Sequence, residues 1–227
     1  MNDLPAGMVT IDKAYSVHPQ LLIPSNTEFG YLTKRTFDIF VSAVGLLVFS
    51  PLLLIAMIAV FISMGWPVLY SPTRAGRNNS LIVVRKFRSM KIAEGPTSHH
   101  SGDDDPRVTK TGRMIRKFKL DELPQLWNVL RGDMSFVGPR PESSDYVKLY
   151  TEEQMAIMEL RPGITDFASI EFADLGTLLK GEDPDKLYFE KVWDRKMELR
   201  MKYVRERGFW IDIKLMFLTF SAIFNRK

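Results

Sequence analysis

The hydrophobic pattern of the chain is dominated by one long apolar segment near the N-terminus. No charged residue occurs between Asp38 and Arg74, and residues 39–64 read IFVSAVGLLVFSPLLLIAMIAVFISM. This run is longer than the ~18 apolar residues that indicate a membrane helix, and it is apolar on every face, unlike a helix of a water-soluble core. It starts too late for a secretory signal, and no small-residue cleavage site follows. The pattern therefore predicts a helix that resides in the membrane.

Ser50 and Pro51 divide this segment near its middle. Proline lacks an N–H group and its ring crowds the carbonyl of Leu47, so we expect a kink at which the Ser50 hydroxyl can donate to a freed backbone carbonyl. The halves 39–50 and 51–64 would each rise only about 18–21 Å, less than the ~30 Å hydrocarbon core. A re-entrant helix–break–helix is therefore one prediction, and a single kinked span is the other.

Charges on both sides of the segment favour the re-entrant alternative. Lys34 and Arg35 precede it, and several cations follow it with no acid before Glu94: Arg74, Arg77, Arg85, Lys86 and Arg88. Positive flanks face the cytoplasm, so both ends prefer the same side of the membrane. We expect a leader over residues 1–33, a re-entrant membrane helix over 34–72 and a cytosolic domain over 73–227.

Outside that segment the pattern predicts a mainly α-helical monotopic membrane protein with a small β-hairpin. Short apolar runs at 68–70 and 81–84 flank the polar stretch SPTRAGRNNS, as the arms of a hairpin do. Helical patterns occur at residues 112–119, 122–130, 143–159 and 183–207, and the last mixes acids and bases as a solvated helix does. Residues 209–224 are apolar but carry Asp212 and Lys214, which predicts an amphipathic helix lying in the membrane interface. A core helix is the alternative for this last segment.

Composition narrows the chemistry that such a protein can perform. The 227 residues include 31 Lys and Arg against 27 Asp and Glu. The resulting net charge of +4 is much smaller than that of proteins that coat nucleic acid. The absence of cysteine excludes disulfides, thiolate metal sites and a Cys nucleophile, and three histidines give no basis for a His-rich metal centre. Any catalysis must therefore rest on carboxylates, hydroxyls and cations.

An acidic pair precedes a predicted helix in the run KLDELPQLW. Pro124 suits the first helical turn, and Asp121 or Glu122 suits the cap before it. There the helix dipole, Lys117 and Lys119 would stabilise a carboxylate anion. An ionised Asp among cations could attack a phosphate, and a neighbouring Glu could hold a divalent metal. Simple N-capping is the alternative interpretation.

A basic stripe and a basic motif are candidates for binding phosphate. Lys110, Arg113 and Lys117 share one helical face, and Lys86 and Arg88 follow the predicted hairpin. The stripe could bind phosphates, anionic lipid or nucleic acid, or it could be an ordinary solvated face. The membrane segment nearby and the absence of interleaved stacking aromatics favour lipid or phosphate over nucleic acid.

An arginine between two prolines is a further candidate. Arg140 lies between Pro139 and Pro141, so its planar fork is carried on a stiff backbone and pre-aimed, for example at a diphosphate. Arg161 begins the later run RPGIT. A turn with an exposed arginine is the alternative.

Between about Lys34 and Thr165 the chain resembles the bacterial sugar transferase family, the monotopic polyprenyl-phosphate hexose-1-phosphate transferases or phosphoglycosyl transferases. The resemblance is carried by successive motifs: KRTFDIF, SP, KFRSM, DPRVTKTGRMIRKFKLDELPQLWNVLRGDMSFVGPRP and RPGIT. It implies transfer of a sugar-1-phosphate from a UDP-sugar to undecaprenyl phosphate with release of UMP. This is the first membrane step in assembling a glycan such as O-antigen lipopolysaccharide, capsule, exopolysaccharide or glycoprotein.

The resemblance also implies roles for individual residues. Asp121 would attack the sugar-linked phosphate and form a phosphosugar–enzyme intermediate, and Glu122 would help to hold Mg²⁺. The segment Pro139–Pro141 would lie near the nucleotide, and Lys86 and Arg88 would contact phosphate. Ser50 and Pro51 would form the break of a re-entrant segment.

The implied location is the cytoplasmic face of the bacterial inner membrane. The implied partners are a UDP-sugar, undecaprenyl phosphate and membrane lipid, with no nucleic acid, and a homo-oligomer is compatible with the sequence. The chain resembles the small, stand-alone form of the family without a multi-span module. It departs from the family after RPGIT, where many relatives have Gly-Trp-Ala and this chain has residues Asp166, Phe167 and Ala168, so the sugar is left open.

Three rival functions remain at this stage. A membrane-bound glycosyltransferase would move the sugar without its phosphate and release UDP. A non-catalytic adaptor would use the basic stripe to dock on lipid, and a membrane-tethered nucleic-acid binder would show steeply salt-dependent binding.

Overall fold

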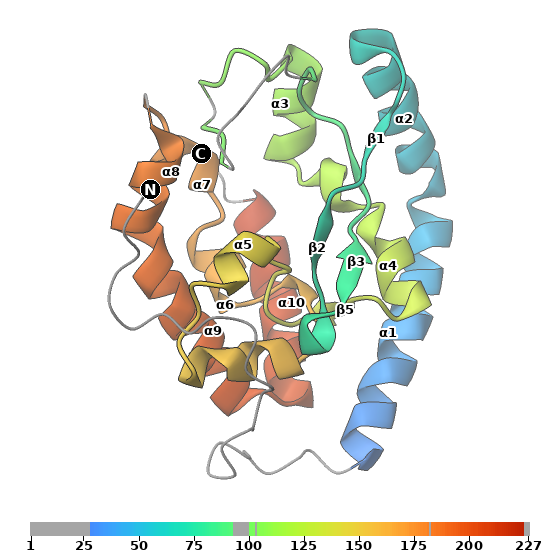
Figure 1. Cartoon of the computed structure of the whole chain (residues 1–227). Coiled ribbons are helices and arrows are strands. Elements are labelled where there is room, and N and C mark those ends of the chain that lie inside the picture. The colour runs from blue at the N-terminus through green and yellow to red at the C-terminus, as the bar shows by residue number, and fades with distance from the viewer. Residues whose placement is uncertain (1–27, 93–99, 103, 182, 225–227) are drawn as a thin grey trace.

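The protein is described by a computed structural model over residues 28–92, 100–102, 104–181 and 183–224. Most of the expected leader, residues 1–27, therefore lies outside the described residues. Within them the chain is mainly helical, and its short strands form three two-stranded sheets. In Figure 1 the strands lie in the middle of the molecule, with α1 and α2 on the right and α8 and α9 on the left. The expectation of a mainly α-helical protein with little β-structure is confirmed.

Two apolar helices, α1 (Glu28–Val48) and α2 (Ser50–Met64), follow one another along one side of the molecule (Figure 1). They are bent by 62° at the break, where the Ser50 hydroxyl donates to the Leu47 carbonyl over 2.8 Å. The kink and this hydrogen bond agree with the sequence-based expectation. Among the described residues, no helix taken alone is both long and apolar enough to cross a bilayer, whereas the bent pair taken together meets that criterion.

Both apolar helices have one face packed and one face exposed. Ala56 and Val60 of α2 are buried against Phe87 and Ile115 of the domain beside it. The opposite faces leave large apolar side chains uncovered, including Phe40, Leu47, Phe61 and Ile62. Arg35, a cation that precedes the apolar segment, attaches α1 to the rest of the protein. Arg35 donates to the carbonyls of Val129 and Leu130, at 2.6 and 2.8 Å.

One long antiparallel hairpin follows α2. Strand β1 (Leu69–Tyr70) pairs with β4 (Lys86–Phe87), and β2 (Thr73–Ala75) pairs with β3 (Leu81–Val83) in the same continuous register. The prediction of a hairpin in this segment is correct, but the expected pairing of 68–70 with 81–84 is wrong. The turn is confined to the short helix η2 (Arg77–Asn79) and its flanks. The strands next to this turn, β2 and β3, therefore pair with each other, and β1 is left to pair with β4.

The helix α3 (Lys110–Lys117), the turn η3 (Leu120–Glu122) and the helix α4 (Gln125–Arg131) come next. Helix α3 crosses the chain directly after β4 at very short range. A Cβ atom on Gly112 would lie 1.8 Å from the Ser89 carbonyl oxygen, so only glycine fits at this crossing. The crossing brings the KFRSM motif against the helix that leads into the acidic pair.

A parallel pair of strands, β5 (Ser135–Val137) and β6 (Gly163–Thr165), joins the SFVGPRP and RPGIT motifs. A Cβ on Gly163 would lie 2.1 Å from the Gly138 backbone nitrogen, so the two chains approach too closely for a side chain there. The sequence pattern did not predict these strands, because three-residue strands are too short to show alternation.

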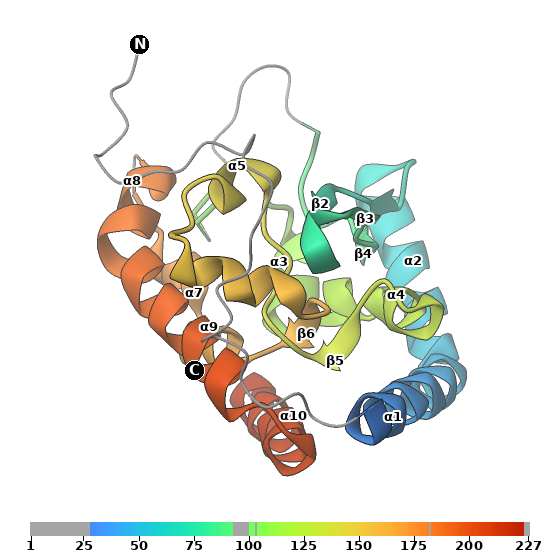
Figure 2. The ribbon, with the colours of Figure 1, turned by 60° about the horizontal axis from the view of Figure 1, so that its bottom comes forward.

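The remaining chain forms helical elements that cover β5 and β6 on the side away from α1 (Figure 2). They are α5 (Ser144–Val147), η4 (Glu153–Glu159), α6 (Phe167–Glu171), α7 (Leu175–Leu178), α8 (Pro184–Tyr188), η5 (Phe189–Trp193), α9 (Asp194–Glu206) and α10 (Phe209–Phe224). The helix expected over 143–159 is therefore interrupted, and that over 183–207 contains a π-helical turn at η5. The interpretation of 183–207 as a solvated helix is wrong for α9, which buries Met197, Arg200 and Tyr203.

Helix α10 lies beside α1 at one edge of the molecule (Figure 2). Leu215 and Asp212 are buried against the domain, whereas Trp210, Phe217 and Phe220 are exposed, with Trp210 at 79%. One face of the helix therefore belongs to the core, as the second alternative expected, and the other is an uncovered aromatic face. The position of this face in a membrane interface stays a prediction.

Replacement of Gly112 by alanine should destabilise the protein. The added methyl group would collide with the Ser89 carbonyl, and overpacking of this kind costs about 1–3 kcal/mol or more. Gly208→Ala is the matched control, because a Cβ there would find its nearest neighbour at 4.0 Å. Thermal unfolding in detergent, followed by circular dichroism, should show a lower midpoint for Gly112→Ala than for Gly208→Ala. Equal midpoints would contradict the close crossing.

Candidate functional site

The acidic pair lies in the turn η3, between α3 and α4. The turn is set up by Lys119, which adopts a left-handed conformation with φ of 56°. Neither acid caps the helix that follows, because Pro124 occupies the N-cap of α4 and no side chain donates or accepts there. The alternative of simple N-capping is therefore wrong, and the two carboxylates have different surroundings.

Arg140 binds Glu122 through both arms of its guanidinium. Nη1 donates to Oε2 over 3.0 Å and Nη2 donates to Oε1 over 2.6 Å. Lys119 adds a longer ion pair, with its Nζ 3.9 Å from Oε1. Burial would raise the pKa of Glu122, but the charges of Arg140 and Lys119 outweigh it and hold the pKa below its usual range. Glu122 is thus a fixed anion.

Asp121 differs from its neighbour, because it is buried and one of its two carboxylate oxygens has no partner among the described residues. Its Oδ1 has no hydrogen-bond donor among the described residues. Burial and the negative charge of Glu122 raise the pKa of Asp121, against the opposing charges of Lys86, Lys119 and Arg116. The expected stabilisation of the Asp121 anion by nearby cations is present, but burial has the larger effect and raises the pKa to about 6. A carboxylate stripped of water is a stronger nucleophile than a solvated one, because no hydration shell has to be removed before it reacts.

Lys86 supplies a cation from the hairpin side of the site. Its ammonium lies over the ring of Tyr70, 5.4 Å from the ring centroid, on the neighbouring strand β1. Burial and the charge of Arg140 lower the pKa of Lys86 to about 8, and the charges of Asp121 and Glu122 oppose this shift. Lys86, Asp121, Glu122 and Arg140 therefore form one electrostatic cluster.

Three other predicted phosphate ligands are placed elsewhere. Arg88 is buried and donates to the carbonyls of Met64 and Gly65 at the end of α2, with its Nε left unpartnered among the described residues. Arg113 is exposed on α3, on the same face as Lys110 and Lys117. Within the described chain, no hydrogen bond or ion pair joins these arginines to the acidic pair.

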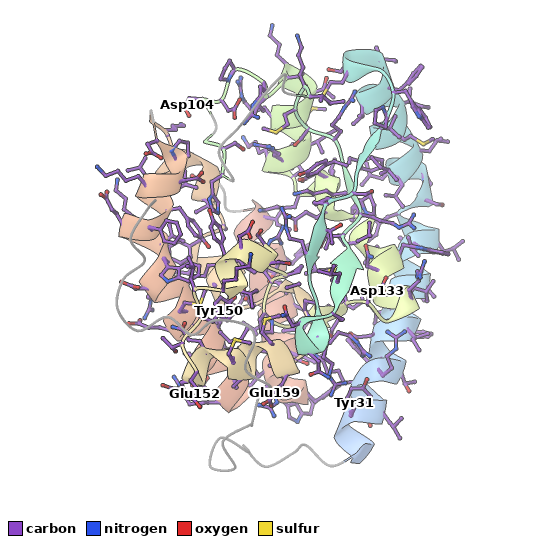
Figure 3. All side chains as sticks on the ribbon, viewed as in Figure 1. Tyr31, Asp104, Asp133, Tyr150, Glu152 and Glu159 are labelled. Carbon is purple, nitrogen blue, oxygen red and sulfur yellow. The ribbon has the colours of Figure 1, made fainter. Side chains whose placement is uncertain are left out.

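The third of these residues, Arg161, lies beside the N-terminal end of α1. It donates to the Tyr31 hydroxyl over 2.8 Å, and Figure 3 shows Tyr31 near the lower end of that helix. Its guanidinium also lies over the Tyr31 ring, as does that of Arg77. Arg161 is therefore not joined to Asp121 or Glu122 by any contact within the described residues.

Residues that the sequence did not single out support the Pro139–Pro141 segment. Arg200 of α9 donates to the Arg140 carbonyl over 2.8 Å, to Glu142 over 2.9 Å and to the Tyr150 hydroxyl over 2.7 Å. Lys196, one turn earlier, also donates to Glu142, over 2.7 Å. The spacing of Lys196 and Arg200 by four residues was visible in the sequence, but it was interpreted as part of a solvated face.

The acidic pair fits a hard divalent cation. The described residues contain no group of three or more His, Cys, Asp or Glu side chains suited to a metal ion. Mg²⁺, however, is usually held by one or two carboxylates together with water and substrate phosphate oxygens. Asp121 offers an unpartnered buried oxygen, and each Glu122 oxygen keeps a lone pair beyond the one used by Arg140. The donor set is therefore suitable for Mg²⁺ completed by a phosphate ligand.

Comparison with known proteins gives a consistent result. The sequence profile described as bacterial sugar transferase matches residues 29–226. A protein of Komagataeibacter xylinus named undecaprenyl-phosphate glucose phosphotransferase is 38% identical over 209 residues, covering 88% of this chain. The uncharacterized sugar transferase EpsL of Bacillus subtilis (strain 168) is 37% identical over 192 residues, covering 85% of this chain.

A third relative is the UDP-glucose:undecaprenyl-phosphate glucose-1-phosphate transferase of Escherichia coli (strain K12), which is 40% identical over 200 residues and 86% of this chain. The relatives differ in how much of their own length is matched. The aligned part is 87% of the B. subtilis protein, but only 37% of the K. xylinus protein and 41% of the E. coli protein.

Loss of the Arg200 guanidinium should destabilise the protein strongly. Arg200→Met leaves Glu142 buried with one counter-charge fewer, and breaking a buried ion pair costs about 3–5 kcal/mol. Arg195→Met on the same helix is the matched control, because Arg195 pairs with Glu171 and Glu198 at the surface. Denaturant unfolding should show a large drop in the free energy of unfolding for Arg200→Met only. Equal losses in both variants would disprove the assignment of a buried network.

Proposed function

The chain belongs to the bacterial sugar transferase family, and on that premise we propose that it transfers a sugar-1-phosphate from a UDP-sugar to undecaprenyl phosphate. The products are undecaprenyl-diphospho-sugar and UMP. The observation that carries this proposal is the buried Asp121, whose Oδ1 has no hydrogen-bond partner among the described residues, beside a Glu122 that is paired with Arg140. The names of the K. xylinus and E. coli relatives describe transfer of the same kind.

In the first step the Asp121 carboxylate attacks the phosphorus that carries the sugar. An oxygen–phosphorus bond forms at Asp121, the bond from that phosphorus to the oxygen bridging the two phosphates breaks, and UMP leaves with the bonding electrons. The product is an acyl phosphate, a mixed anhydride between the Asp121 carboxyl group and the sugar-1-phosphate. The attack brings an anion onto a charged diphosphate, so nearby positive charge is required, and Lys86 and Arg140 supply it.

In the second step the lipid phosphate resolves the intermediate. A phosphate oxygen of undecaprenyl phosphate attacks the same phosphorus, and the Asp121 carboxylate leaves in its original form. No proton has to be gained or lost by Asp121 in the complete cycle. Because UMP leaves before this attack, the lipid phosphate does not have to approach the more highly charged UDP-sugar.

Asp121 and Glu122 are proposed to hold Mg²⁺ when substrate is bound. The ion would act as a Lewis acid and offset negative charge on the phosphates. Lys86 and Arg140 offset only part of that charge. Arg140 has a second task at this position, because its contacts with both Glu122 oxygens fix the direction in which the remaining lone pairs point.

The apolar pair α1–α2 is proposed to be a re-entrant anchor at the cytoplasmic face of the inner membrane. Its outer ends are attached to the same folded unit, by Arg35 to the carbonyl end of α4 and by Arg88 to the carbonyls of Met64 and Gly65. A span would have to place these attachment points on opposite sides of the bilayer.

The dimensions of the bent pair suit one leaflet. The helical stretches 30–48 and 50–64, bent by 62° and inserted symmetrically, would bring the break only about 12–15 Å below their outer ends, within half of a ~30 Å core. The exposed aromatic face of α10 is proposed to lie in the same interface, with Trp210 at headgroup level. The domain would then hold Asp121 near the level of the lipid phosphate.

The nucleophile can be tested without the lipid acceptor. A panel of UDP-sugars should include one that loads a phosphosugar onto the wild-type protein, visible as an added mass with release of UMP. Asp121→Asn should abolish the adduct and lower the rate of transfer by about 10³-fold or more, as loss of a nucleophile does. Asp145→Asn is the matched control, because Asp145 pairs with Lys148 at the surface. An adduct that persists in Asp121→Asn would exclude this residue as the nucleophile.

The same assay separates the rival functions. Release of UDP instead of UMP would indicate a glycosyltransferase that moves the sugar without its phosphate. Lipid binding without release of either nucleotide would indicate an adaptor.

The topology can be tested on a clean background, because the chain contains no cysteine. Leu32→Cys and Trp66→Cys place single thiols at exposed positions near the two outer ends of the pair. A membrane-impermeant maleimide should label both from the cytoplasmic side, in inverted vesicles, and neither from the periplasmic side. Ile55→Cys, near the break and 63% exposed within the protein, should resist labelling from either side if it is covered by lipid. Labelling of the two ends from opposite sides would show a span.

A further inference from the structure

The main chain of Arg140 is held on both sides by buried charged groups. Its N–H donates to Asp166 Oδ2 over 3.2 Å, and its carbonyl accepts from Arg200 Nη2 over 2.8 Å. Its side chain adds a hydrogen bond to the Ile164 carbonyl over 3.1 Å before it reaches Glu122. Arg140 is thus fixed at its amide, its carbonyl and its guanidinium.

The two supporting side chains are inaccessible to solvent and come from separate elements. Asp166 is 0% exposed and precedes α6, where its other oxygen accepts from the Ser169 N–H over 2.6 Å. Arg200 is also 0% exposed and lies on α9. The Arg200 Nε lies 3.9 Å from Asp166 Oδ2, so the two groups also attract one another directly.

Burying a charged side chain costs free energy unless the charge is paired, and apolar residues could fill the same space without that cost. The contacts of Asp166 and Arg200 converge on one residue, whose guanidinium carries the bidentate contact in the site. A displacement of about 1 Å in a reacting constellation can cost about 100-fold in rate. Side chains that fix the Arg140 backbone would therefore fix the position of its guanidinium relative to Glu122 and Asp121.

We infer that Asp166 and Arg200 are positioning residues of the transfer reaction, which act by holding the Arg140 backbone so that its guanidinium meets Glu122. They touch neither carboxylate of the acidic pair, and their effect passes through Arg140. The inference rests on the proposed function, because it assigns these residues to the same site.

Asp166→Asn is the most selective test of this role. Asparagine keeps one acceptor oxygen for the Ser169 N–H and the start of α6, but it places an NH₂ group where the Arg140 N–H needs an acceptor. With the UDP-sugar that supports wild-type UMP release, kcat should fall by about 10- to 100-fold. KM for the UDP-sugar should change less than kcat. Arg200→Lys, which keeps the charge but loses the fork, should show the same pattern.

A double-mutant cycle distinguishes positioning from a general structural effect. If Asp166 acts through Arg140, the variant combining Arg140→Lys with Asp166→Asn should be no slower than Arg140→Lys alone, within about twofold. Independent effects would instead multiply, and this result would overturn the inference, as would a wild-type kcat in Asp166→Asn. Arg195→Lys on the exposed side of α9 is the control and should leave the rate unchanged. Rates are expressed per folded molecule, measured by circular dichroism.

A second measurement does not depend on turnover. Hydrogen exchange of the peptide containing Arg140 should become faster in Asp166→Asn and in Arg200→Lys, and should stay unchanged in Arg195→Lys. Unchanged exchange in the first two variants would overturn the inference. A wild-type protein that released no UMP from any UDP-sugar would contradict the proposed function, while the exchange experiment would still decide whether Asp166 and Arg200 hold Arg140.

Discussion

The bidentate ion pair between Arg140 and Glu122 is the interaction on which the candidate site depends. It joins the segment after β5 to the turn η3 and gives a buried carboxylate the counter-charge without which burial would be prohibitive. Beside this pair, the Oδ1 of Asp121 is buried and has no hydrogen-bond partner among the described residues. The two adjacent acids thus acquire opposite pKa shifts, one lowered by Arg140 and one raised by burial. Such divergence is typical of carboxylates with different chemical roles.

The apolar helices α1 and α2 are attached to the domain that carries the candidate site. Sequence rules interpret Arg35 as a topology signal that flanks a membrane segment, whereas the structure shows its guanidinium on the carbonyl end of α4. Arg88 has the corresponding place at the carbonyl end of α2. Two cations therefore bind the ends of helices, where positive charge is favoured, and they link the bent pair to the elements that carry the acidic residues. A fixed link of this kind would keep Asp121 at a constant height above the anchor.

Local features of the fold were predictable to a large extent. The kink at Ser50, the hairpin after α2 and the helices α3, α4 and α10 follow from proline chemistry, turn residues and helical periodicity. The pairing within the hairpin was not predictable, because it depends on how tightly the turn at Arg77–Asn79 closes. The short strands β5 and β6 were missed because three residues carry no period. In α9, mixed charges suggested solvent exposure, but Arg200 is buried among acidic and hydroxyl partners.

The sequence by itself determined the break in the apolar segment, the adjacent pair Asp121 and Glu122, and a chemistry restricted to carboxylates, hydroxyls and cations. Only the tertiary structure decided which cation serves which partner. Arg140 meets Glu122, Arg88 meets the end of α2, and Arg161 meets Tyr31. The physical reason is that element type is fixed by neighbours along the chain, whereas the partner and the desolvation of a charge are fixed by segments that lie far apart in sequence.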